Sequence, residues 1–254
     1  MKIFFRTILV SLLFWPGAVS AEKLKLCYLE WGKLGGKDLP EKGLLPDAMK
    51  RMFEHAGYDV EVFIRPWNRC IAKTKQLDFD LVLDAWKGPT FDKDFDYLKT
   101  HHIDKIAFVV REDSKIKSGK FEDLAGKRVG YLATSGGLEK FYAKKDTFAL
   151  VSALQTEAAM IRVLAKGRVD AIVSDPVQLL STAEKLVPPI DVKLRVLEPP
   201  IQLNYAAALI SKSHPDKKTI SAAFEKSFRA LVKTNMYAEL EKLHGVKLNL
   251  APLD

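Results

Sequence analysis

Residues 79–84 have the sequence FDLVLD, and residues 169–175 have the sequence VDAIVSD. Each segment runs from one aspartate through a short, mostly apolar stretch to another aspartate, which predicts a buried strand that ends in a polar turn. Each segment also closes a stretch of chain in which strand and helix signals alternate. This repetition predicts two similar α/β units.

The same order of predicted strands and helices precedes both segments. In the first unit we expect strands over 23–29, 58–64 and 80–84, with helices over 45–56 and from Pro66 onward. In the second unit we expect strands over 126–132, 148–152 and 171–174, with helices over 138–145 and 157–166. Alternating strands and helices favour parallel sheets with right-handed crossovers. The fold class is therefore α/β.

Two further strand-like runs, 106–111 and 202–211, connect the units, and apolar spacing predicts C-terminal helices over 219–233 and 236–244. If the second run returns the chain to the first unit, lobe one comprises 22–104 plus 204–254 and lobe two comprises 105–203. The chain then crosses between the lobes twice, which predicts a two-stranded hinge.

The first 21 residues have the pattern of a secretory signal peptide. Lys2 and Arg6 precede an apolar run over 8–15, and small residues at 18–21 predict cleavage after Ala21. The run is too short to span a membrane. We therefore expect an exported, periplasmic protein. Without the signal peptide the net charge falls from +8 to +6 and is spread over the helices, so we expect no nucleic-acid partner.

Two cysteines, Cys27 and Cys70, would enter a compartment that oxidises thiols. The sequence leaves open whether they form a disulfide, because no geometry can be checked. The chain has no HExxH or CxxC motif, and its five histidines have no recognised spacing, so we expect neither a metal site nor a cofactor.

Several segments together carry a family resemblance: FVVREDS at 108–114, FEDLAGKRVG at 121–130, LAKGRVDA at 164–171 and the helix start PWNR at 66–69. With the exported start, they make the chain similar to the bacterial extracellular solute-binding proteins of family three, which mostly serve amino-acid uptake. The resemblance implies a two-lobed periplasmic-binding-protein (venus flytrap) fold that closes on a small-molecule solute. It also implies a monomer whose partner is a membrane ABC permease or a receptor.

In open α/β sheets, ligands bind beyond the carboxyl ends of the strands. We therefore expect the cleft to include the turn Thr134, Ser135, Gly136, which lies between a strand and a helix. Free backbone N–H groups there favour an anion, and the resemblance implies a ligand carboxylate. The alternative is that Thr134 or Ser135 simply caps the helix.

Acidic and aromatic side chains complete the expected site. The resemblance implies that Asp175 takes a ligand ammonium, although it could instead cap the turn before Pro176, and Asp84 is its counterpart in lobe one. Flat aromatic faces could sandwich an apolar group or a cation, with core packing as the alternative for each. The aromatic candidates are Trp31, Trp67, Trp86 and Tyr205.

The chain departs from the family at one position. Members that bind α-amino acids normally carry an arginine after the third strand of lobe one that clamps the ligand carboxylate, but residues 86–97 contain none. Lys87 or Arg69 could supply the charge, although neither matches the motif. The ligand is therefore either an amino acid or another small polar solute that carries an amine or a carboxylate.

Two other functions fit parts of the sequence. Residues 133–137 approximate the nucleophile elbow of a serine hydrolase, and Asp175 with His214 or His244 would complete a triad. Both histidines are predicted to lie on lobe one, far from Ser135, so we expect no enzyme. A ligand-sensing module for a membrane receptor would have the same fold and cleft.

Overall fold

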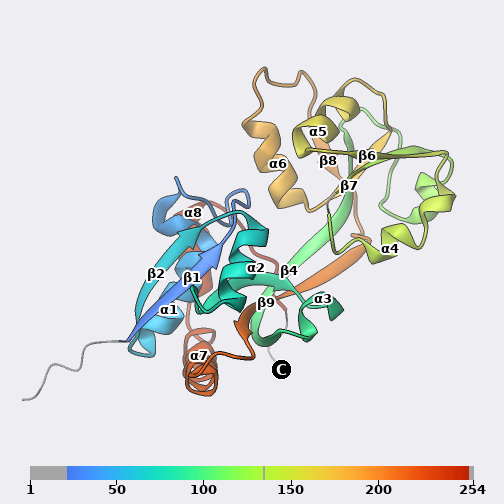
Figure 1. Ribbon diagram of the computed structural model, residues 1–254. Helices are drawn as coiled ribbons and strands as arrows, with labels where there is room; N and C mark the ends of the chain where they lie inside the picture. Colours follow the sequence, from blue (N-terminus) through green and yellow to red (C-terminus); the bar gives the residue numbers. More distant parts are fainter. Residues whose placement is uncertain (1–21, 134, 252–254) are drawn as a thin grey trace, which may run out of the picture.

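A computed structural model describes residues 22–133 and 135–251; the predicted signal peptide and Thr134 lie outside this range. Figure 1 shows two groups of helices and strands joined by two long strands, β4 and β9. The first lobe contains β1 (Lys23–Tyr28), α1 (Leu44–His55), β2 (Asp59–Ile64), α2 (Trp67–Lys75), β3 (Leu81–Trp86), α3 (Pro89–Asp92), α7 (Lys217–Leu231) and α8 (Met236–His244). No helix within the described ranges is both long and apolar enough to cross a membrane.

The second lobe is built from the middle of the chain. It contains β5 (Arg128–Leu132), α4 (Glu139–Tyr142), β6 (Leu150–Leu154), α5 (Glu157–Ala165), β7 (Ala171–Ser174), α6 (Pro176–Glu184) and β8 (Leu194–Val196). The helix predicted over 138–145 is shorter than expected, because a 3-10 turn over Lys145–Thr147 takes up the end of that segment. The residue boundaries of the lobes stay a prediction.

The strands form one continuous sheet in the order β2-β1-β3-β9-β4-β7-β5-β6, with β8 also paired to β4. β1 is parallel to β2 and β3, and β5 is parallel to β6 and β7, which confirms the parallel units expected from the alternating pattern. β4 (Phe95–Arg111) starts well before the predicted run at 106 and pairs antiparallel with β9 (Gln202–Ser211). Polar residues interrupt the first half of β4, so this half lacks the apolar pattern from which a strand is predicted.

Each lobe has its own apolar core. The larger cluster of the first lobe lies between its strands and the helices α1, α7 and α8. Beside it, Cys27 of β1 and Cys70 of α2 form a disulfide with an S–S distance of 2.03 Å, packed against Val82 and Leu209. This bond settles the alternative that the sequence left open.

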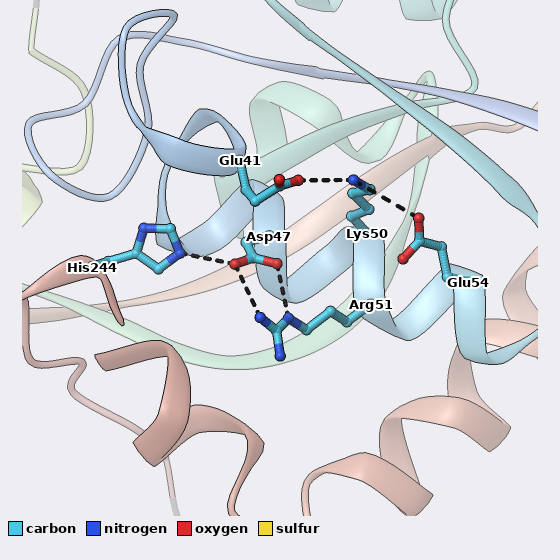
Figure 2. A network of polar contacts seen from close by, with 6 residues as sticks. All are labelled: Glu41, Asp47, Lys50, Arg51, Glu54 and His244. Carbon is cyan, nitrogen blue, oxygen red and sulfur yellow. Dashed lines mark hydrogen bonds and ion pairs between the residues drawn. The ribbon is translucent and has the colours of Figure 1, made fainter. Parts of the chain in front are cut away.

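A buried polar network attaches the C-terminal helix to α1 (Figure 2). His244, the last residue of α8, lies 2.9 Å from Asp47 in the first turn of α1, and both side chains are almost fully buried. Arg51, one turn later, donates to the same carboxylate at 2.9 Å. The outer part of the network consists of ion pairs among Glu41, Lys50 and Glu54. The network therefore joins the C-terminal end of α8 to the first turn of α1.

Candidate functional site

Asp175 directly follows β7 as predicted, whereas β3 continues beyond Asp84 to Trp86, and the charges of the two aspartates interact. Asp84 lies in β3, where the pairing with β9 shifts register between Val82 and Ala85, and its φ of 60° is left-handed. Non-glycine residues rarely adopt this conformation, and bulges of this kind re-aim side chains. Asp175 follows β7 and accepts a hydrogen bond from the Gln178 amide at 2.8 Å, so it does cap α6. Asp175 is therefore both the N-cap of α6 and a buried side chain.

A histidine between two aspartates forms the centre of the site. His102 Nδ1 lies 3.0 Å from Asp84 Oδ1, and His102 Nε2 lies 3.3 Å from Asp104 Oδ1. The outer oxygens of the carboxylates accept hydrogen bonds from aromatic residues: Tyr28 Oη donates to Asp84 at 3.0 Å, and Trp86 Nε1 donates to Asp104 at 2.5 Å. All three central side chains are at most 6% exposed. We call these three residues, with Asp175, the acidic cluster.

Crowding of like charges away from water perturbs the protonation of this cluster. Burial alone would lower the pKa of His102, but the carboxylates of Asp84 and Asp104 outweigh it and raise the pKa to about 9. Burial, reinforced by Asp84, raises the pKa of Asp104 to about 8. Burial likewise raises the pKa of Asp175 to about 6. Near neutral pH, the cluster therefore holds fewer negative charges than its carboxyl groups can carry.

The site is continuous with a seam where each lobe inserts a side chain into the other. Trp86, at the end of β3, packs against the apolar cluster of the second lobe. Its ring covers Gly137 so closely that a Cβ added there would lie 2.1 Å from the indole. In return, Val177 of α6 packs against the apolar cluster of the first lobe. Trp31 meets Trp86 edge to face, with ring centroids 6.3 Å apart.

Several polar atoms along this seam lack partners among the described residues. Gly32, in the loop after β1, lies against Ser181 and Gln178 of α6. The buried atoms Trp31 Nε1, Gln178 Oε1 and Ser181 Oγ have no hydrogen-bond partner. Unpaired buried polar groups are rare in native proteins, and a bound molecule or water is a usual explanation.

The turn expected to bind an anion is not directly followed by a helix. Ser135 donates its backbone N–H to Leu132 and its hydroxyl to Gly136. The helix α4 begins only at Glu139, with Leu138 at its N-cap and no side-chain cap, so Ser135 does not cap it. Asn204 donates to the carbonyl of Gly137 at 3.1 Å, and Trp86 covers the same residue. The backbone N–H of Ser135 is therefore already hydrogen-bonded within the protein.

The remaining candidates have other surroundings, although Tyr205 pairs with Ile103, between His102 and Asp104 on β4. Trp67 packs beside the disulfide in the first lobe, edge to face with Phe91. Tyr205 is half exposed on β9. Arg69 is exposed, and the ammonium of Lys87 lies over the ring of Tyr97.

The structure does not bring the candidate residues of a serine-hydrolase triad together either. His214 lies 2.9 Å from Asp80, and His244 is held by Asp47, both within the first lobe. Ser135 therefore has neither histidine as a partner in this arrangement.

His102 and Asp104 were not predicted as site residues. Their signal is weak: an HID triplet at 102–104, just before the predicted crossing strand. Donor atoms of Asp84, His102 and Asp104 all lie within 4.8 Å of one another, so these residues could hold a metal ion. As placed, however, both ring nitrogens of His102 face carboxylate oxygens, and a protonated imidazole fills the position of a cation. A cavity of about 20 Å³ adjoins Asp84 and His102, and it has room for about one water molecule.

Comparison with solved structures identifies the fold. The chain is similar to the probable amino-acid ABC transporter extracellular-binding protein ytmK from Bacillus subtilis, with a TM-score of 0.73 and 17% identity over 88% of this chain and 98% of that one. The L-cystine solute receptor of Neisseria gonorrhoeae, in an unliganded open conformation, gives a TM-score of 0.67 and 18% identity over 91% and 95% of the two chains.

A histidine kinase sensor domain similar to periplasmic binding proteins matches equally well, with a TM-score of 0.67 and 18% identity over 90% of this chain and 99% of that one. No family model matches the sequence. No curated protein matches it significantly. At these identities the likeness shows the fold, which is the two-lobed α/β fold of the periplasmic binding proteins.

Proposed function

We propose that this protein is a periplasmic solute-binding protein of an ABC transporter, which captures a small polar solute between its lobes and delivers it to a membrane permease. The fold supports this function, since similar structures include amino-acid and cystine binders. The predicted signal peptide agrees with it. The protein acts as a monomer, by binding and without catalysis.

The observation that carries the proposal is the buried polar cluster at the interlobe seam. Asp84 belongs to the first lobe, Asp175 to the second, and Asp104 to the strand that joins them. A solute held by these carboxylates would contact both lobes at once. Binding would therefore favour the closed arrangement, which a permease can distinguish from the open one.

A thermal-shift screen of small polar solutes tests this function. A solute at one hundred times its dissociation constant adds about 2.7 kcal/mol to the free energy of unfolding, which raises the melting temperature of a chain of this size by roughly 5–10 °C. Small-angle scattering of the same samples should show a smaller radius of gyration with the solute. If amino acids, amines and small carboxylates all leave both quantities unchanged, the proposal fails.

The second candidate is a sensor module that presents its solute to a membrane receptor. The similarity to a histidine kinase sensor domain favours it. Both functions predict the same solute and the same closure, so a pull-down from membranes with the solute-loaded protein separates them. Recovery of a permease supports transport, and recovery of a receptor kinase supports sensing.

A further inference from the structure

The acidic cluster contains more carboxyl groups than cations. Asp84, Asp104 and Asp175 are buried, and His102 is the one cationic group that contacts them among the described residues. Buried charges are normally paired, because an uncompensated one costs several kcal/mol. The cluster therefore has fewer cationic partners than carboxyl groups.

The carboxylates are also held in fixed positions. Tyr28 and Trp86 each hold the outer oxygen of one carboxylate, which leaves the inner oxygens of Asp84 and Asp104 turned toward the ring of His102. Backbone N–H groups at the start of α6 hold Asp175. Pre-oriented carboxylates bind a cation more strongly than mobile ones, since they lose less entropy on binding.

Aromatic rings adjoin this acidic cluster. The planes of Trp31 and Trp86 meet at 82°, and Trp86 is bonded to Asp104. A corner of two indole rings beside carboxylates is a favourable environment for an organic cation, because the ring faces attract positive charge and the ring area contacts the attached carbon atoms.

Groups that could bind an anion are scarce in the same region. Arg69 and Lys87 are exposed, the Lys87 ammonium lies over the ring of Tyr97, and the Ser135 N–H is bonded to Leu132. The seam also contains buried polar atoms of Trp31, Gln178 and Ser181 that have no hydrogen-bond partner among the described residues. A hydroxyl or a second amine would suit this mixture of donor and acceptor atoms.

From these observations we infer that the solute is an organic cation, an amine or a guanidine, which the acidic cluster and the Trp31–Trp86 corner recognise without requiring a carboxylate. This inference rests on the proposed function, since it assumes a solute in the seam. It also accounts for the missing arginine: a ligand without a carboxylate needs no clamp for one. The raised pKa of Asp104 is consistent with it, because this carboxyl group would release its proton as the cation arrives.

Matched compounds test the inference on the intact mature chain. Arginine and agmatine share a guanidinium and differ by one carboxylate, lysine and cadaverine form a second such pair, and glutarate carries carboxylates alone. By isothermal titration calorimetry we expect agmatine or cadaverine to bind at least as tightly as its parent amino acid, and glutarate not to bind. Asp104→Asn should weaken amine binding about 10-fold or more, because a buried charge pair is lost. Asp113→Asn is the control, since its side chain is 74% exposed and pairs with Arg111.

The contrary outcomes are distinct. If arginine or lysine binds and its decarboxylated form does not, or if glutarate binds, the inferred ligand class is wrong while solute binding stands. If Zn²⁺ binds and no amine does, the cluster is a metal site and the inference is overturned. If no compound of any class binds, both the inference and the proposed function fail. Because the compound comparison uses the unaltered protein, it remains decisive even if Asp104→Asn does not fold.

Discussion

Replacing Gly137 by alanine should push the lobes apart. The added Cβ would lie 2.1 Å from Cε3 of Trp86 and 2.6 Å from Nδ2 of Asn204. Carbon atoms in contact stay about 3.5 Å or more apart, so the indole must retreat by roughly 1.4 Å. Trp86 has little room within the seam, since its Nε1 is bonded to Asp104 and its ring meets Trp31.

Two costs contribute, and a second glycine separates them. Gly137 has a φ of +64°, and alanine in this left-handed conformation costs about 1–2 kcal/mol. Gly126 has a φ of +69° with no atom within 4 Å of an added Cβ, so Gly126→Ala measures the backbone cost alone. A clash within a rigid core adds about 1–3 kcal/mol. At Gly137 the clash is relieved if the lobes separate, so both variants should lose about the same stability.

Urea denaturation and small-angle scattering check this prediction together. We expect Gly137→Ala to have a larger radius of gyration than the wild type and to bind its solute more weakly, while Gly126→Ala matches the wild type in both. The reasoning is refuted if Gly137→Ala keeps the wild-type radius of gyration. In that case, if Gly137→Ala is less stable than Gly126→Ala by about 1–3 kcal/mol, Trp86 and Gly137 belong to one rigid body. If the two variants are equally stable, Trp86 and Gly137 do not touch in solution.

Three further predictions concern the cluster, the C-terminal helix and the disulfide. The free energy of unfolding should fall as the pH rises from 5.5 to 8.5, because the raised pKa values of Asp104 and His102 make the folded protein hold protons that the unfolded chain releases. Asp104→Asn should reduce this fall by about 3 kcal/mol in urea titrations, while the facing groups Tyr28, Asp84 and Asp175 remain. If the pH dependence of Asp104→Asn equals that of the wild type, Asp104 does not hold a proton in the folded cluster. His244→Ala should cost about 1.5–3 kcal/mol by leaving buried Asp47 without one partner, whereas Lys50→Ala in the outer part of the same network should cost less than about 1 kcal/mol; equal losses would show that the contact between α8 and α1 is not buried. Replacing Cys27 and Cys70 by serine should lower the free energy of unfolding by about 4 kcal/mol, as expected for a bond that closes a loop across 43 residues, and a loss below about 1 kcal/mol would mean that the bond does not form.

The sequence allowed the two repeated strands to be predicted, because their signal is local. An apolar run that stops at an aspartate predicts the carboxyl end of a strand, so Asp84 and Asp175 were expected at the cleft; β7 ends at Ser174 as predicted, whereas β3 continues past Asp84 to Trp86. Helix spacing similarly predicted α8 at the bounds that the structure has. The absence of an arginine after the third strand could also be read directly.

What could not be predicted depends on register and on contacts between the lobes. His102 reaches Asp84 because β4 shifts register against β9 between Lys99 and Ile103. A shift of one residue would send the imidazole to the other face of the sheet. The contact of Trp86 with Gly137 depends on how the lobes meet, which no local pattern contains.

A crystal structure with agmatine or cadaverine, whichever raises the melting temperature more, would show whether an organic cation binds at the acidic cluster. The account predicts an amine or guanidine nitrogen within about 3 Å of the carboxylates of Asp104 and Asp175, beside the indole rings of Trp31 and Trp86. The carbon chain should extend along the seam toward Ser181. A cation bound outside the seam, or one in the seam that contacts neither aspartate, would contradict it.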